Sequence, residues 1–541
     1  MKKIISIMLF LLCSSGLGAK EHKDIIVIPV EINEVAFTVT MEQFQQVLDR
    51  SNLYMKQLGG HYPDSLVLGP IIRLTSGRYT PATVRAAVTD AYRACSAIID
   101  MGKFSNNVGI IFSGDLIWPH EDKLQSGGRQ YFAMSEYFQG QSLETGIICH
   151  EYGHILGLRD LYDADNDNSG GQSKGLYGSL SLMDKGDRLD NLHTPSGLSA
   201  IELNQLGIGQ CDTLHPGVYT LQPLSRERRY LYLATDTPKE FFLLECRAAE
   251  NWDEFIGGEG LVIYHIDQSN NKAGFSSYYN SVLSASQRWE NNEVNCRPDR
   301  MCAYVVEALP DAENISDIFF PYGDIQHISS ETTPALRYWN GKGSPLAITG
   351  ISRNADKSVS FNVIEPIKTL ETISLQTTAI IRWQLDRSLL GDLSSCKVTL
   401  NSASETVVVE DLTPSPRGEI LFRADNLHSN TEYKAELVVH CSDVDYSVSN
   451  NFKTQIKDER NDIPFIFLGM VHKTPTGFFE KDSTFPLYVY NGHKAENIRW
   501  YFNDSEIEGS LFTVSGNGIL RAVLSYEDGS EEVIIKEIKV R

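Results

Sequence analysis

The chain has little positive charge and no block of basic residues. Lysine and arginine number 48 against 70 aspartates and glutamates, which gives a net charge of −22. The sequence also contains no convincing internal repeat and no low-complexity tract. Beyond its first residues it has no apolar stretch long enough for a membrane helix. An acidic chain of this kind is repelled by polyanions. The composition therefore argues against nucleic acid and anionic membranes as partners, and it predicts no transmembrane segment.

The first residues have the features of an export signal. Lys2 and Lys3 precede the apolar run 4–12, and small residues follow up to Ala19. The run of nine residues is too short to span a bilayer. We therefore predict a signal peptide over residues 1–19 and an exported mature protein that is secreted, periplasmic or held at the cell surface.

A length of 541 residues predicts about three or four domains. Residues 20–210 alternate strand and helix signals and begin with a buried apolar strand. Thr40 and Gln43 have the spacing of a capping box, and Ser142 is placed to cap a helix over residues 143–156. These signals predict an α/β domain.

From residue 211 onward the pattern changes to short β-type runs separated by turns, which predicts a β-rich domain over residues 211–365. Residues 366–456 and 457–541 each carry several strand-length segments and predict two β-sandwich modules. With Trp383 in an early strand, the first resembles a fibronectin type III module. The second resembles an immunoglobulin-like module, with Trp500 in an early strand.

Eight cysteines remain after the predicted signal peptide, and an even number in an exported chain permits disulfides. In a fibronectin-like order, Cys396 starts the third strand and Cys441 ends the sixth. Because these strands are antiparallel neighbours, we predict a Cys396–Cys441 disulfide, with two buried thiols as the alternative. Cys95 and Cys149, both on predicted helices, are a second candidate pair.

One segment carries recognisable chemistry, because it contains H-E-x-x-H inside a predicted helix: His150-Glu151-Tyr152-Gly153-His154. Residues four apart share a helix face, so both imidazoles can reach one metal ion while Glu151 points at its open side. A zinc ion held in this way lowers the pKa of water and polarises a carbonyl, and a carboxylate accepts the proton.

The residues after the motif strengthen the metal interpretation over a chance pair of histidines. Gly157 allows the chain to turn back after the second histidine. Asp160 can then supply an oxygen as third ligand and leave the fourth position open.

With this extension the sequence resembles the immune inhibitor A family of secreted zinc metallopeptidases, metzincin-like zincins with the motif H-E-x-x-H-x-x-G-x-x-D. The resemblance spans roughly residues 25–365. Further segments that carry it are Leu161-Tyr162-Asp163, Ser181-Leu182-Met183-Asp184 with Gly186, Pro195 to Gly207, Glu245 to Arg247, Trp252-Asp253 and Gly260 to Asp267.

The resemblance implies a zincin catalytic domain over residues 20–210, with zinc held by His150, His154 and Asp160. It implies that Glu151 is the general base and that Met183 is the methionine-turn residue beneath the metal. The spacing does not identify an oxyanion-stabilising residue. Tyr177 is one candidate, and a packed tyrosine is the alternative.

Two features depart from the simplest form of the family. Members often carry an inhibitory propeptide, whereas the first strand here is expected only a few residues past the signal. We therefore expect either no latent form or latency imposed by the C-terminal modules. His265 and Asp267 lie two apart on a predicted strand and face the same side, so they could bind a second ion. A buried hydrogen-bonded pair is the favoured interpretation.

Three alternating carboxylates follow the third ligand directly. Asp163, Asp165 and Asp167 lie in a polar loop that continues into Ser169 and two glycines. Closely spaced carboxylates on such a turn suit calcium, although the late glutamate of an EF-hand loop is missing. The sequence therefore predicts a possible calcium site, with a solvated acidic loop as the alternative.

Together these features predict an exported zinc endopeptidase that cleaves proteins or peptides by metal-activated water. Its appended modules would hold substrate or a cell-surface or matrix partner. The alternative function is an adhesion or binding protein with a catalytically idle zincin domain. The intact Glu151 argues against this alternative, because an idle domain has no chemical need for that carboxylate.

Overall fold

The computed structural model describes residues 23–540, except for several short gaps. The predicted signal peptide and the side chain of Cys441 lie outside the described residues. None of the helices within the described part is both long and apolar enough to cross a bilayer. The gaps are residues 58–64, 76–78, 125–128, 139, 331, 387–392, 410–411, 442–444, 456–463, 469–477, 491 and 493–494.

The chain forms two compact units. The N-terminal unit comprises the described residues up to Leu214, Thr220–Ile325 and Ser352–Ser360. The C-terminal unit comprises His215–Tyr219, Gln326–Ile351 and the described residues from Phe361 onward. The predicted domain boundaries at 210, 365 and 456 stay predictions.

The N-terminal unit begins with a six-stranded sheet in the order β2-β1-β4-β6-β5, with β3 also paired to β1. All pairings are parallel except that of β5, which runs antiparallel to β6 at the edge of the sheet. The strands are β1 (Ile25–Ile32), β2 (Leu66–Leu68), β3 (Ile72–Leu74), β4 (Asn107–Phe112), β5 (His120–Lys123) and β6 (Gln130–Ser135).

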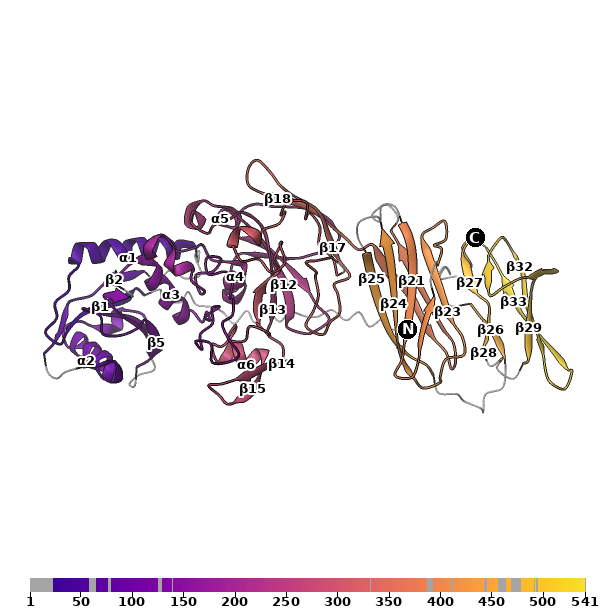
Figure 1. Ribbon diagram of the computed structural model, residues 1–541, viewed down its shortest axis with the longest axis horizontal. Coiled ribbons are helices and arrows are strands. Elements are labelled where there is room, and N and C mark those ends of the chain that lie inside the picture. The colour runs from indigo at the N-terminus through magenta and orange to yellow at the C-terminus, as the bar shows by residue number, and fades with distance from the viewer. Residues whose placement is uncertain are drawn as a thin grey trace. The chain divides into compact units, whose positions relative to one another are not determined.

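Helices cover both faces of this sheet, because successive residues of a strand point to opposite sides. Ile25 and Val27 of β1 pack with α1 and α3, whereas Ile26 and Ile28 pack with α2. Figure 1 shows α1 and α2 on opposite sides of the strands. The helices of the unit are α1 (Met41–Met55), α2 (Val84–Ser96), α3 (Thr145–Ile155), α4 (Ala200–Leu206), α5 (Leu224–Glu227) and α6 (Ala285–Glu290).

Of the two predicted helix caps, the structure shows one. Thr40 and Gln43 form the predicted capping box at α1. The prediction of Ser142 as a cap is wrong, because Ser142 belongs to the two-residue strand β8 (Gln141–Ser142), which pairs with β7 (Tyr137–Phe138). The N-cap of α3 is instead Glu144, whose side chain makes no capping hydrogen bond.

A second sheet of the N-terminal unit has the order β16-β13-β12-β11-β9. Leu243 and Val262 from its central strands belong to the same buried cluster as the side chains of α1 and α3. The predicted α/β and β-rich segments therefore share one core. The strands are β9 (Gln210–Thr213), β11 (Arg229–Ala234), β12 (Glu240–Arg247), β13 (Gly260–Asp267) and β16 (Ala303–Val305), with the hairpin β14 (Lys272–Ser276) and β15 (Ser281–Ser284) beside them.

Five short 3-10 turns complete the described helical elements of the N-terminal unit. The division between the two compact units runs through three strands, β10 (Gly217–Leu221), β17 (Ala347–Arg353) and β18 (Val359–Ile364). The 3-10 turns are η2 (Pro81–Thr83), η3 (Met101–Lys103), η4 (Gly186–Leu192), η5 (Asn251–Asp253) and η6 (Ile315–Asp317).

From β19 to β25 the C-terminal unit forms two antiparallel sheets around a core that contains the fully buried Trp383. Their orders are β19-β20-β23 and β22-β21-β24-β25. The strands are β19 (Ile367–Ser374), β20 (Ala379–Leu385), β21 (Leu393–Asn401), β22 (Thr406–Val409), β23 (Glu419–Ala424), β24 (Glu432–Cys441) and β25 (Asp445–Lys453).

The last segment has a separate core around Trp500. Its described strands form the pairs β26-β28 and β27-β31 and the sheet β30-β29-β32-β33. The strands are β26 (Phe465–Phe467), β27 (Thr484–Pro486), β28 (Tyr488–Tyr490), β29 (Asn497–Phe502), β30 (Ser505–Ile507), β31 (Leu511–Thr513), β32 (Gly518–Ser525) and β33 (Glu531–Ile538).

The cysteine predictions have different outcomes. A Cys95–Cys149 bridge is wrong, because the two buried thiols belong to cores on opposite faces of the first sheet. The strands β21 and β24 are antiparallel neighbours, as predicted, and Cys396 is paired with Val439 two residues before Cys441. The Cys396–Cys441 disulfide stays a prediction, because the side chain of Cys441 lies outside the described residues.

Candidate metal centre

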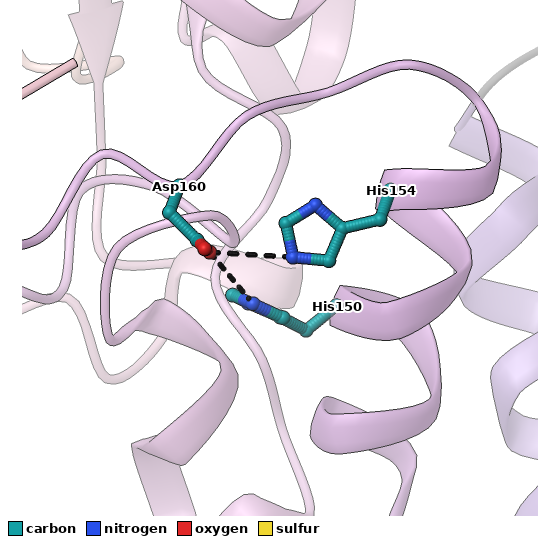
Figure 2. Close-up of side chains that lie close together, drawn as sticks. All are labelled: His150, His154 and Asp160. Carbon is teal, nitrogen blue, oxygen red and sulfur yellow. Dashed lines mark ion pairs between the residues drawn. The ribbon is translucent and has the colours of Figure 1, made fainter. Parts of the chain in front are cut away.

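Two imidazoles from helix α3 and one carboxylate from the loop that follows it lie close together. His150 and His154 lie one turn apart, with ring centroids separated by 5.0 Å. The Nε2 atoms of His150 and His154 lie 3.1 and 3.3 Å from the Oδ1 atom of Asp160. Figure 2 shows both histidines projecting from the helix toward one carboxylate oxygen from the loop that follows. The three donor atoms lie within 4.8 Å of one another and could hold one metal ion.

The turn that carries Asp160 back to the helix depends on Gly157. Its φ of +100° is in the left-handed region, where glycine is favoured. The Gly157 N–H donates to the His154 carbonyl, and the Leu158 N–H donates to the Gly153 carbonyl. These two bonds form the Schellman arrangement that ends a helix. The sequence-based role of Gly157 is therefore confirmed.

The remaining ring nitrogens fix how the imidazoles point. His150 Nδ1–H donates to the Leu182 carbonyl over 2.9 Å, and His154 Nδ1–H donates to the Leu158 carbonyl over 3.1 Å. Because Nδ1 of each ring is engaged by a carbonyl, Nε2 is the nitrogen that faces Asp160. Neutral imidazoles in this orientation are suited to bind a metal ion.

The Oε2 atom of Glu151 is buried without a hydrogen-bond partner, and Oδ1 of Asp160 is buried against the two imidazoles. Although burial alone raises a carboxyl pKa, the charges of His154 and His150 hold the pKa of Asp160 well below its usual range. Burial raises the pKa of Glu151 to about 7, against the opposing effect of both histidines. Two nitrogens, one carboxylate oxygen and a neighbouring carboxylate are a donor set that fits a catalytic zinc ion.

Met183 packs against helix α3 at Gly153. A Cβ on Gly153 would stand 2.7 Å from the Met183 sulfur, so the thioether packs where α3 has no side chain. Glu202 Oε1 accepts a hydrogen bond from the Met183 N–H, and the Met183 carbonyl accepts one from Leu161 N–H at 2.8 Å. Met183 thus links the helix to the loop after Asp160, and its role as the methionine-turn residue stays a prediction.

Sequence reasoning missed two residues of the site. Asn292 bonds to Asp160 twice, from a segment 132 positions further along the chain. Asp187 is buried, and its charge acts on His150, whereas burial raises the pKa of Asp187 itself. Asp187 directly follows the recognised Gly186 and could have been noticed, whereas the sequence contains no signal for Asn292.

The structure brings together only two of the three carboxylates of the predicted calcium loop. Asp163 and Asp165 lie close to each other, and the third donor of this group is the thiol of Cys296. Asp167 is exposed and is not part of the group. Burial raises the pKa of Cys296 to about 12, so the thiol is protonated at neutral pH. Calcium binding at this loop stays a prediction.

Two further candidates are engaged in other interactions. His265 is buried and contacts Glu240 at 2.9 Å and the Tyr304 hydroxyl at 2.6 Å, while Asp267 pairs with Arg300. Both residues are buried and hydrogen-bonded, as expected, but each bonds to other partners, so the structure does not show the favoured hydrogen-bonded pair of His265 with Asp267. The hydroxyl of Tyr177 lies against the Glu307 carboxylate. The Tyr177 hydroxyl is therefore engaged by Glu307 and does not take up the candidate oxyanion-stabilising role.

A cleft of about 840 Å³ opens beside Asp160. One wall is the tip of the β14–β15 hairpin, where the Ser277 N–H donates to Ser169 Oγ at 2.9 Å and Tyr278 is 81% exposed. The lining residues are Asp160, Tyr162, Ala164, Asp165, Asn166, Asn168, Ser277, Tyr278, Tyr279, Asn291, Asn292 and Glu293. The metal centre therefore borders a space of ligand-binding size.

No protein-family model matches the chain, and no curated protein matches its sequence. Similar solved structures include a computationally redesigned β-sandwich protein, at 23% identity over 17% of this chain and 93% of that chain. A structure described as a myokine is 10% identical over 17% of this chain and 98% of its own. A segment of two fibronectin type III domains from chicken tenascin is 14% identical over 32% of this chain and 97% of its own. Each has a TM-score of 0.14, which identifies neither a family nor a function.

Proposed function

We propose that the protein is an exported zinc metalloendopeptidase that hydrolyses peptide bonds of extracellular proteins. The observation that carries the proposal is the convergence of the His150 and His154 Nε2 atoms on Asp160 Oδ1. The unpartnered, buried carboxylate of Glu151 beside them supplies a proton acceptor. The resemblance to the immune inhibitor A metallopeptidases supports the same function.

In this proposal each residue has a distinct chemical task. When bound, a zinc ion supplies the Lewis acidity that polarises the scissile carbonyl. His150, His154 and Asp160 hold the ion, and the carbonyls of Leu182 and Leu158 keep the two rings in place. Glu151 accepts the proton of the attacking water at its carboxylate and passes it to the leaving amine.

The cleft beside Asp160 supplies a place for the substrate chain. The amide of the exposed Asn166 can bond to a peptide backbone, and the exposed Tyr278 offers an aromatic surface. We further propose that the C-terminal modules hold substrate or a cell-surface or matrix partner, and that calcium binds the Asp163–Asp165 loop. Calorimetry that finds no calcium binding to the zinc-loaded protein would exclude the last point.

The decisive experiment is a digest of an unbiased peptide library by the zinc-loaded full-length protein, with and without a chelator. Wild type should cleave, and the chelator should abolish cleavage. Glu151→Ala should also abolish cleavage yet keep its zinc, because Glu151 is not among the three converging donors. Glu42→Ala, which removes an exposed carboxylate from α1, is the matched control and should behave as wild type.

The possible failures have different meanings. If zinc-loaded wild type cleaves no peptide, the idle binding protein becomes the better proposal. If Glu151→Ala loses its zinc, or keeps chelator-sensitive activity near wild type, the roles within the motif are assigned wrongly.

A further inference from the structure

Asn292 holds the third metal-binding residue with both ends of its amide. Its Oδ1 accepts a hydrogen bond from the Asp160 N–H at 2.7 Å, and its Nδ2 donates to Asp160 Oδ2 at 2.6 Å. One side chain therefore fixes both the backbone and the carboxylate of Asp160. A carboxamide can do this because it presents a donor and an acceptor side by side.

The loop that carries Asp160 needs an external anchor. Helix α3 ends at Ile155, and in the described part of the chain the next regular element is η4, which begins at Gly186. No helix or strand between these described elements holds Asp160 in place. With Oδ2 engaged by Asn292, the remaining oxygen Oδ1 faces the two imidazoles (Figure 2).

The segment that presents Asn292 is itself firmly held. Asn292 has a φ of +59°, a left-handed conformation that asparagine tolerates better than most residues. Three residues further on, Asn295 Nδ2 donates to the Leu161 carbonyl at 2.8 Å, and Asn295 Oδ1 accepts from the Ala303 N–H of β16. The buried Arg288 pairs with Glu293 at 3.2 Å and donates to the Ala273 carbonyl.

We propose that Asn292 is a positioning residue of the metal centre, through which the predicted β-rich domain fixes the third ligand. The inference rests on the proposed zinc site and extends it to a residue outside residues 20–210. Partners that orient metal ligands commonly contribute ten- to a hundredfold to metal affinity. The metal centre is thus built from both predicted segments of the N-terminal unit.

The test measures zinc affinity of the full-length protein by competition with a chromophoric chelator. Asn292→Ala should raise the zinc Kd about ten- to a hundredfold. Asn292→Asp, which keeps an acceptor but replaces the donor with a like charge beside Asp160, should raise it at least as much. Asn291→Ala is the matched control, because it removes a neighbouring amide that lines the same cleft. It should leave the Kd within about twofold of wild type.

A second readout separates positioning from general support of the fold. The visible spectrum of the cobalt-substituted protein reports ligand geometry, and it should change in Asn292→Ala while the far-ultraviolet circular dichroism does not. At saturating zinc, kcat should fall while KM stays near wild type. If Asn292→Ala does not fold, the zinc Kd and the cobalt spectrum of the near-isosteric Asn292→Asp provide the test.

An unchanged zinc Kd and an unchanged cobalt spectrum in the folded Asn292 variants would overturn the inference and leave the proposed function standing. Wild type that takes up no zinc would instead overturn the proposed function, and the inference with it. The wild-type titration alone distinguishes these two results.

Discussion

At the scale of single residues, the protonation of His150 links zinc binding to pH. Burial alone lowers a histidine pKa, but the hydrogen bond to Asp160 and the charges of Asp187 and Asp160 outweigh it and raise the pKa of His150 to about 10. Below that pH the metal-free protein carries a proton on His150, and zinc must displace it because only the neutral imidazole binds metal. Zinc affinity should therefore rise from pH 6 to pH 8.

Calorimetric zinc titrations at pH 7 in two buffers of different ionisation enthalpy measure this linkage. We expect at least about one proton to be released per zinc ion bound. His154→Ala removes a ligand and should weaken zinc binding itself, which separates ligand loss from proton competition. Equal heats in both buffers, after correction for zinc–buffer binding, would show that no proton is released and that His150 is neutral in the metal-free protein.

Residues close together in sequence were predictable at this scale, and distant ones were not. His150, Glu151, His154 and Asp160 follow from helical spacing and one glycine turn, because each lies within ten residues of the others. Asn292 comes from a segment 132 positions away, and only the packing of two sheets on one core brings it to Asp160. No local pattern encodes such a contact.

At the scale of elements, the packing of α3 against η4 depends on Gly146. A Cβ at this position would stand 1.8 Å from the Asp187 carbonyl oxygen and 3.0 Å from that of Leu192. Gly146→Ala must therefore separate the two elements. The free energy of unfolding should fall by at least about 1–3 kcal/mol.

Chemical denaturation measures this loss, and Gly516→Ala provides the control. A Cβ on Gly516 meets no atom within 4 Å, so the unfolding free energy should change by no more than about 0.5 kcal/mol. Zinc affinity should fall in Gly146→Ala only, because α3 carries both histidines. Equal stability of the two variants would contradict the close packing of α3 and η4.

Element boundaries show why the sequence was a partial guide. The capping box of α1 is set by neighbouring residues and was predicted correctly. The start of α3 was misplaced because Ser142 is drawn into the short pairing of β7 with β8, a tertiary context that overrides its capping preference. Strands β11, β12 and β13 lie within the segment 211–365 that was predicted as β-rich, since their buried apolar residues leave few alternatives.

At the scale of the whole molecule, the two compact units should respond differently to metal removal. All three donors lie between His150 and Asp160, and Asn292, which holds Asp160, belongs to the same unit. A ligand that binds only the folded state stabilises it, by about 2.7 kcal/mol when present at a hundred times its Kd. Zinc should therefore stabilise the N-terminal unit alone.

Scanning calorimetry of the zinc-loaded full-length protein should accordingly show two unfolding transitions, and a chelator should lower the Tm of one of them. The transition that moves should be the same one that Gly146→Ala lowers, whereas Gly516→Ala should leave it in place. Glu151→Ala protein should show an equal chelator shift, because it keeps its zinc and cannot digest itself during the scan. A shift of both transitions, or of neither, would show that the metal centre does not stabilise the N-terminal unit independently of the rest of the chain.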